Sequence, residues 1–77
     1  MNRQQARALH LSLVMDRIRA DPYPSSTQMT MVEQALPESP ELLADYMQIL
    51  AEKVASTNHP SPSMLRRLGV VAEMFPR

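Results

Sequence analysis

Cysteine is absent from the 77-residue chain. This absence excludes disulfide bonds, thiolate zinc sites and thiol catalysis, and it suits a reducing compartment, so we expect a cytoplasmic protein. Glycine occurs once, at Gly69, which leaves no glycine-rich loop to hold a phosphate group. Tryptophan is also absent, and only two tyrosines and one phenylalanine are present. The scarcity of aromatic residues counts against a surface that stacks on nucleic-acid bases.

Length and hydropathy limit the chain further. A sequence this short predicts a single helical domain over residues 1–77, and its hydrophobic core is expected to be marginal. No apolar run approaches the roughly 18 residues of a membrane span. Residues 8–15 are apolar, but the charged residues Asp16, Arg17 and Arg19 follow where a signal cleavage site needs small residues. We therefore expect this stretch to belong to the mature fold and expect no membrane partner.

Neither sign of charge is in excess, since eight basic residues balance eight acidic ones. The charges are unevenly distributed: the net charge is +3 over residues 1–20, −5 over residues 21–56 and +2 over residues 57–77. Such an order can join parts of one chain, or two chains, as readily as it attracts an anionic ligand.

Seven prolines divide the chain into four segments that are rich in helix-forming residues. Proline ends helices and is tolerated at their first position, whereas the β-branched and aromatic residues typical of strands are few. The pattern predicts an all-α fold, a small bundle of four short helices around a central third helix. The predicted helices cover about residues 3–20, 27–36, 40–56 and 62–75.

Capping residues precede all four segments, at Asn2, Ser25 or Ser26, Ser39, and Ser61. Gln5 completes a capping box with Asn2. Pro40 and Pro62 follow their serines at the first helical position, so Ser39 and Ser61 are predicted to be equivalent N-caps.

Apolar residues at helical spacing predict one core face on each helix. The expected core residues are Leu11, Val14, Met15 and Ile18; Met29, Val32 and Leu36; Leu42, Leu43, Tyr46, Met47, Ile49, Leu50 and Val54; and Met64, Leu65, Leu68, Val71, Ala72 and Phe75. Tyr23 lies between two prolines, where we expect a lid over the end of the bundle, with an exposed aromatic anchor as the alternative.

Five apolar residues lie outside the predicted core faces, and they predict a protein interface. Ala6, Leu9 and Leu13 form a second apolar sector on residues 3–20, nearly opposite the first, while Val70 and Met74 point away from the core face of residues 62–75. One helix of a small bundle buries only one broad face in its own core. A second copy of the chain is the expected partner, because a two-fold dimer adds the core that a small domain lacks.

The alternative is a small DNA- or RNA-binding regulator. Arginine reads phosphate and guanine through two parallel hydrogen bonds, and the candidate contacts are Arg3, Arg7, Arg17, Arg66 and Arg67. Zero net charge opposes this alternative, and so does the acidic character of residues 40–56, which hold Glu41, Asp45 and Glu52. Arginines that converge on one open face would favour nucleic acid, whereas burial against those acidic residues would favour assembly.

Catalytic motifs are missing. The sequence has neither a nucleophile motif of the form G-x-S-x-G nor a pair of histidines one helical turn apart, because His10 and His59 are separate. Glu41 and Asp45 lie one turn apart on a ridge that we expect to be solvated. The sequence therefore predicts a non-catalytic protein-binding module with no cofactor, no metal and no small-molecule substrate.

Overall fold

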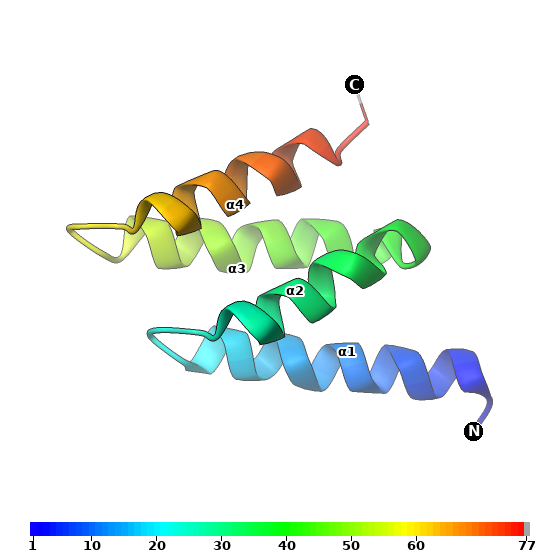
Figure 1. The fold of residues 1–77 in the computed structure, drawn as a ribbon. Coiled ribbons are helices and arrows are strands. Elements are labelled where there is room, and N and C mark those ends of the chain that lie inside the picture. The colour runs from blue at the N-terminus through cyan, green and yellow to red at the C-terminus, as the bar shows by residue number, and fades with distance from the viewer. Residues whose placement is uncertain (77) are drawn as a thin grey trace. The chain divides into compact units, whose positions relative to one another are not determined.

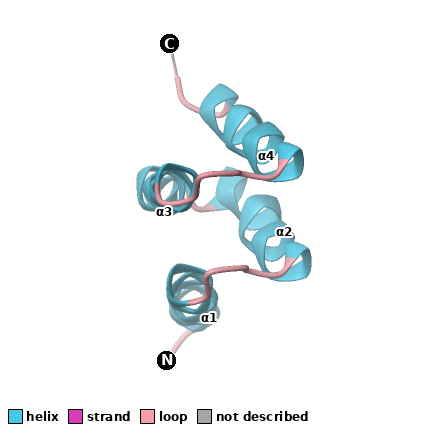
Figure 2. Cartoon of the chain, turned by 90° about the vertical axis from the view of Figure 1, so that its left-hand side faces the viewer, coloured by secondary structure: helices cyan, strands magenta, loops and turns pink. Residues whose placement is uncertain are grey.

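The structure is a computed structural model, and it describes residues 1–76. Within those residues every regular element is a helix, which confirms the predicted all-α fold (Figure 2). The chain divides into two compact units, residues 1–35 and the residues from 36 onward. A single domain over residues 1–77 stays a prediction, which thermal unfolding in one cooperative transition would support.

The first unit is a hairpin of two helices, α1 (Arg3–Ala20) and α2 (Ser26–Ala35), which pack against each other (Figure 1). The predicted capping box begins α1: the Gln5 amide donates to Asn2 Oδ1 at 2.8 Å, and the Asn2 amide donates to Gln5 Oε1 at 2.9 Å. At the start of α2, the Gln28 amide donates to Ser25 Oγ at 3.1 Å. Both helix starts in this unit therefore follow the capping signals in the sequence.

The second unit contains two single turns of 3-10 helix followed by two α-helices. The turns are η1 (Leu36–Glu38) and η2 (Pro40–Leu42), and the helices are α3 (Leu43–Ala55) and α4 (Pro62–Glu73). The helices α3 and α4 pack against each other as a second hairpin. The predicted cap of α4 is present, since the Met64 amide donates to Ser61 Oγ at 3.0 Å and Pro62 is the first helical residue.

The prediction that Ser39 caps the third helix is wrong. Its side chain accepts no capping hydrogen bond, and α3 begins only at Leu43. Pro37 and Pro40 lie so close together that the chain first makes the two tight turns η1 and η2, and the Ser39 carbonyl oxygen accepts from the Leu42 amide at 3.0 Å. For the same reason the second helix stops at Ala35, just before η1.

The two Ser-Pro pairs therefore predict unequal effects of mutation. Ser61→Ala is expected to lower the free energy of unfolding by about 1 kcal/mol, because α4 loses a side-chain cap. Ser39→Ala removes no capping hydrogen bond, so its effect is expected to stay within about 0.5 kcal/mol. Urea unfolding followed by circular dichroism measures both changes. Equal destabilisation by the two substitutions would contradict the assignment of the caps.

Each of the two units buries apolar side chains from its own helices. The buried residues are Leu11, Met15, Ile18, Met29, Val32, Leu36, Leu43, Tyr46, Ile49, Leu50 and Val71. All of them belong to the predicted core faces, and α3 contributes four. Val14, Leu42, Met47, Val54, Met64 and Leu68 are half-buried.

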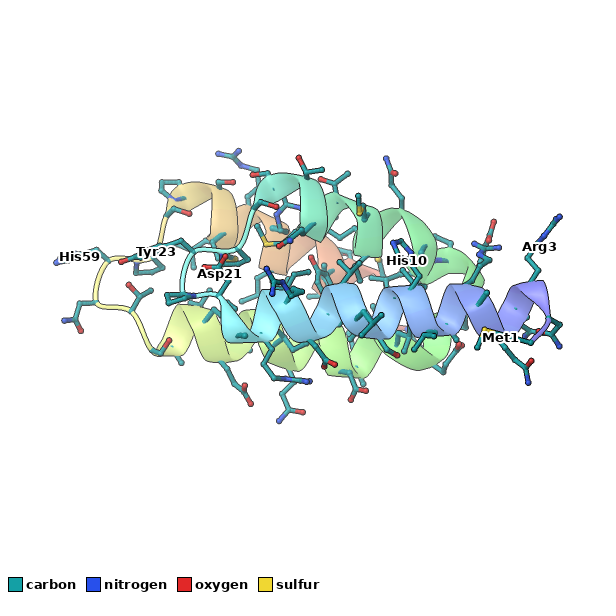
Figure 3. The ribbon with its side chains drawn as sticks, turned by 90° about the horizontal axis from the view of Figure 1, so that it is seen from below. Met1, Arg3, His10, Asp21, Tyr23 and His59 are labelled. Carbon is teal, nitrogen blue, oxygen red and sulfur yellow. The ribbon has the colours of Figure 1, made fainter. Side chains whose placement is uncertain are left out.

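Four expectations about burial are wrong. Tyr23 is 89% exposed and is no lid (Figure 3). On the fourth helix, Leu65, Ala72 and Phe75 are exposed. At 100° per residue, Leu65 and Ala72 lie about 120° and 100° around α4 from the buried Val71, too far to share its contacts. Phe75 faces the same way as Val71, but it lies beyond the last helical residue, Glu73.

Candidate functional site

The side of α1 that points away from its buried residues carries an exposed apolar surface. Leu11, Met15 and Ile18 are buried, whereas Leu9 and Leu13 are 49% and 56% exposed. Ala6 is exposed on the same side, and we call Ala6, Leu9 and Leu13 the outer stripe. Helical geometry places this stripe roughly 180° around α1 from the buried face. The predicted second apolar sector of the first helix is therefore present and accessible.

Arginines lie along the side of α1 between its buried face and the outer stripe. Arg3, Arg7 and Arg17 are all exposed, and they follow the length of α1 over roughly 20 Å at 1.5 Å per residue. Figure 3 shows Arg3 near the N-terminal end of the helix. Of the predicted anionic-partner contacts, these three share one side of one helix.

An ion pair lies near the C-terminal end of the same helix. Arg19 donates from Nη1 to Asp16 Oδ1 at 3.3 Å, and both side chains are more than half exposed. A solvent-screened pair of this kind contributes little to stability. It does hold the single acidic group of α1 at the border of the outer stripe, where it partly offsets the arginines.

The remaining predicted site residues lie on α4 or directly after it, in the second unit. Val70 and Met74 are one turn apart and exposed, Val70 to 53%. Arg66 is exposed, but Arg67 is half-buried. Adjacent residues on a helix point about 100° apart, so these two arginines do not form one cationic surface. The predicted residues therefore fall into an α1 group and an α4 group.

The histidine and carboxylate side chains singled out in the sequence are exposed in the structure. None of these residues forms a group of three or more metal-ligating side chains, and no charged side chain among them is buried. His10 lies on α1 and His59 in the connection between α3 and α4, and both are exposed (Figure 3). Glu41, Asp45 and Glu52 are also exposed.

A shallow hollow of about 320 Å³ lies where α1 leads into α2, and it is lined by Arg17, Ala20, Asp21, Pro22 and Gln28. One of its polar groups is already engaged, because Asp21 Oδ1 accepts from the Tyr23 amide at 2.9 Å. Ligand sites are mostly apolar clefts that enclose the ligand, and this hollow is open and polar.

Each helix within residues 1–76 is too short or too polar to traverse a lipid bilayer.

Comparisons with protein-family models, curated proteins and solved structures find no match to this chain.

The connections inside the two hairpins share a short sequence that the pattern of each helix alone does not reveal. A shift of 36 positions superposes Pro24-Ser25 on Pro60-Ser61, and both serines cap the second helix of their hairpin. The same shift pairs Asp16 with Glu52, Arg17 with Lys53, and Ile18 with Val54. The second helices of the two hairpins therefore begin with the same Pro-Ser capping sequence.

Proposed function

We propose that this chain is a non-catalytic helical module that binds protein, and that it self-associates through the outer stripe of α1. The observation that carries the proposal is the exposure of Leu9 and Leu13 on the side of α1 opposite its buried face. Single exposed leucines are ordinary, but two on adjacent turns beside Ala6 make a continuous apolar surface. Burial of that surface in an assembly would also support a chain too short for a large core of its own.

Further details of the proposal come from the sequence. Val70 and Met74 supply a second exposed apolar pair for partners. Seven methionines in 77 residues suit adaptable binding surfaces. We propose that the module is a small regulatory protein of the cytoplasm. The cytoplasm is a reducing compartment, which suits a chain without cysteine.

Self-association predicts a specific effect of charge on the outer stripe. Leu9→Glu combined with Leu13→Glu is expected to convert the assembly into monomers, because two carboxylates would have to be desolvated in the interface. Sedimentation equilibrium over a wide concentration range measures the change. The matched control is Ala8→Glu with Ser12→Glu, which adds the same charges at the same spacing at two other exposed positions of α1. A native chain that stays monomeric at high micromolar concentration would refute the proposal.

Nucleic-acid binding is the second candidate, favoured by the exposure of Arg3, Arg7 and Arg17 along one side of α1. Two observations weaken it: the chain has zero net charge, and Arg67 is half-buried. Non-specific affinity comes mainly from neutralised phosphates, so a chain without excess cations gains little.

Duplex DNA and single-stranded RNA are accordingly expected to bind no more tightly than a Kd of about 10⁻⁴ M at physiological salt. Fluorescence anisotropy with labelled oligonucleotides measures this affinity. Micromolar binding that weakens with salt and disappears in Arg3→Ala with Arg7→Ala would favour the nucleic-acid function instead.

A further inference from the structure

The outer stripe of α1 is the centre of a longer row of exposed residues, which continues in both directions at steps of three and four. The members of this row, all of them exposed, are Asn2, Ala6, Leu9, Leu13, Asp16 and Ala20. At 100° per residue, they lie within an arc of about 80°. Alternating steps of three and four are the pattern by which one α-helix packs along another. We call these six residues the α1 seam.

The seam carries a single charge. Its centre is formed by Leu9 and Leu13, whereas Asp16 is the one acidic residue of α1. Arg3 and Arg17 are exposed beside the seam, about 100° and 60° around the helix from its middle. A helix that covers the seam must offer Asp16 a cationic or polar neighbour, because an unpaired carboxylate in an interface is costly.

A parallel pair of α1 helices does not meet this requirement. With the two seams in register, each residue faces its own counterpart in the second copy. The two Asp16 carboxylates would then face each other, and both would lose water. Parallel pairing therefore places like charges inside the interface.

An antiparallel pair gives Asp16 a suitable neighbour. The central contacts are Leu9 of each copy against Leu13 of the other. This register sets Asp16 against Ala6 of the second copy, whose small side chain leaves room. Arg3 of the second copy then lies about 4.5 Å from Asp16 along the helix axis, within reach of its long side chain. The two helix dipoles also run in opposite directions, which favours this arrangement.

Repulsion among the other basic residues of α1 is weaker than the contact between two carboxylates. Arg17 lies at the edge of the seam, where an antiparallel pair brings it near Arg3 of the second copy. Both side chains stay in solvent, so salt screens their repulsion. Two carboxylates buried in an interface are screened much less, and their desolvation adds to the cost. Asp16 therefore decides the direction of pairing.

We propose that two copies of the chain pair antiparallel through the α1 seam, with Asp16 of each copy against Arg3 of the other. This inference rests on the proposed self-association, and it names the direction of the helices and the residue that sets it. A second copy fits the seam because its own α1 supplies both leucines for the centre and an arginine for the carboxylate. The same residues are buried on both sides, so the assembly closes as a two-fold dimer.

Cross-linking through single cysteines tests the direction, because the chain has no cysteine of its own. His10→Cys places a thiol beside the middle of the seam, and Ala20→Cys places one at its C-terminal end. In the antiparallel pair, the two thiols at position 10 lie about 3 Å apart along the helix axis, and those at position 20 about 27 Å apart. A short bismaleimide is expected to join His10→Cys chains and to leave Ala20→Cys chains single. Adding Leu9→Glu and Leu13→Glu to each variant gives the rate of chance collision.

Asp16→Asn tests the charge, because it removes the carboxylate and keeps the shape of the side chain. The antiparallel pair loses two ion pairs, so the dimer Kd measured by sedimentation equilibrium is expected to rise about fivefold. A parallel pair would instead be relieved of two facing carboxylates, and its Kd would fall. The matched control is Asp45→Asn, at an exposed position of α3, which changes the net charge equally and is expected to leave the Kd unchanged.

The outcomes separate this inference from the proposed function. Dimers of His10→Cys alone, together with weaker association of Asp16→Asn, would support antiparallel pairing. Dimers of Ala20→Cys, or an Asp16→Asn variant that associates as tightly as the native chain or more tightly, would overturn it, and the proposed function would stand. A native dimer in which neither thiol reacts above the chance rate would overturn it as well. A native chain that is itself monomeric would remove the proposed function and this inference together. Circular dichroism checks that each variant keeps the native helix content.

Discussion

Tyr46→Ala is expected to leave most of the protein unfolded at room temperature. Tyr46 is fully buried on α3, the helix with the most buried residues. Truncation of a buried aromatic side chain costs about 3–5 kcal/mol, because apolar contacts are lost and a cavity remains. A domain of this size has only about 3–5 kcal/mol of stability to lose. Circular dichroism against temperature should show a shallow transition at much lower temperature, or none.

The second tyrosine of the chain provides the control. Tyr23 is exposed in the connection between α1 and α2, so Tyr23→Ala is expected to change the free energy of unfolding by no more than about 0.5 kcal/mol. Both substitutions remove the same atoms, and only their burial differs. Equal losses in the two variants, or a native midpoint for Tyr46→Ala, would show that the core of the second unit is not the one described.

Val32→Asp is expected to have an equally large effect on the first unit. Val32 is fully buried on α2, and no charged residue is buried anywhere within residues 1–76 to partner a carboxylate there. An unpaired buried charge costs several kcal/mol, which a small helical hairpin cannot supply. The backbone amide signals of residues 1–35 should collapse to random-coil positions in an ¹H–¹⁵N spectrum.

Substitution of the neighbouring residue distinguishes the cost of burying a charge from the cost of placing a poor helix former in α2. Met31 is partly exposed, so Met31→Asp introduces the same side chain one position earlier without burying it. Its spectrum is expected to stay native. Collapse in both variants would indicate that aspartate breaks α2 wherever it stands, and the assigned face of the helix would then be unsupported.

Local chemistry accounts for what the sequence predicted well. The capping box of Asn2 and Gln5 and the cap at Ser61 depend on residues within one turn of each other, so they can be derived without knowledge of the fold. The buried residues of α1 and α2 follow from helical spacing for the same reason. The predicted cap at Ser39 is wrong because the two nearby prolines impose 3-10 turns. Their effect is as local as the Ser-Pro capping signal and overrides it.

The exposure of the other side chains depends on which helix faces pack against neighbouring helices. Helical spacing within one segment does not contain that information. Leu65 has the spacing of a core residue yet is exposed. Leu9 and Leu13 are exposed as predicted, because the first helix has two apolar sides and buries only one of them. Tyr23 lies in the connection between α1 and α2 and is exposed, and its place between two prolines did not distinguish this outcome from a lid.

Three leucines on α1 allow the most direct test of the central claim, that the outer stripe is where the chain meets its second copy. Leu9 and Leu13 are exposed in the stripe, and Leu11 between them is buried. Methyl signals of all three can be followed as the protein is concentrated from low micromolar to millimolar. The signals of Leu9 and Leu13 are predicted to shift with concentration while those of Leu11 stay fixed. Signals of Leu9 and Leu13 that remain unchanged over the whole range would contradict the account.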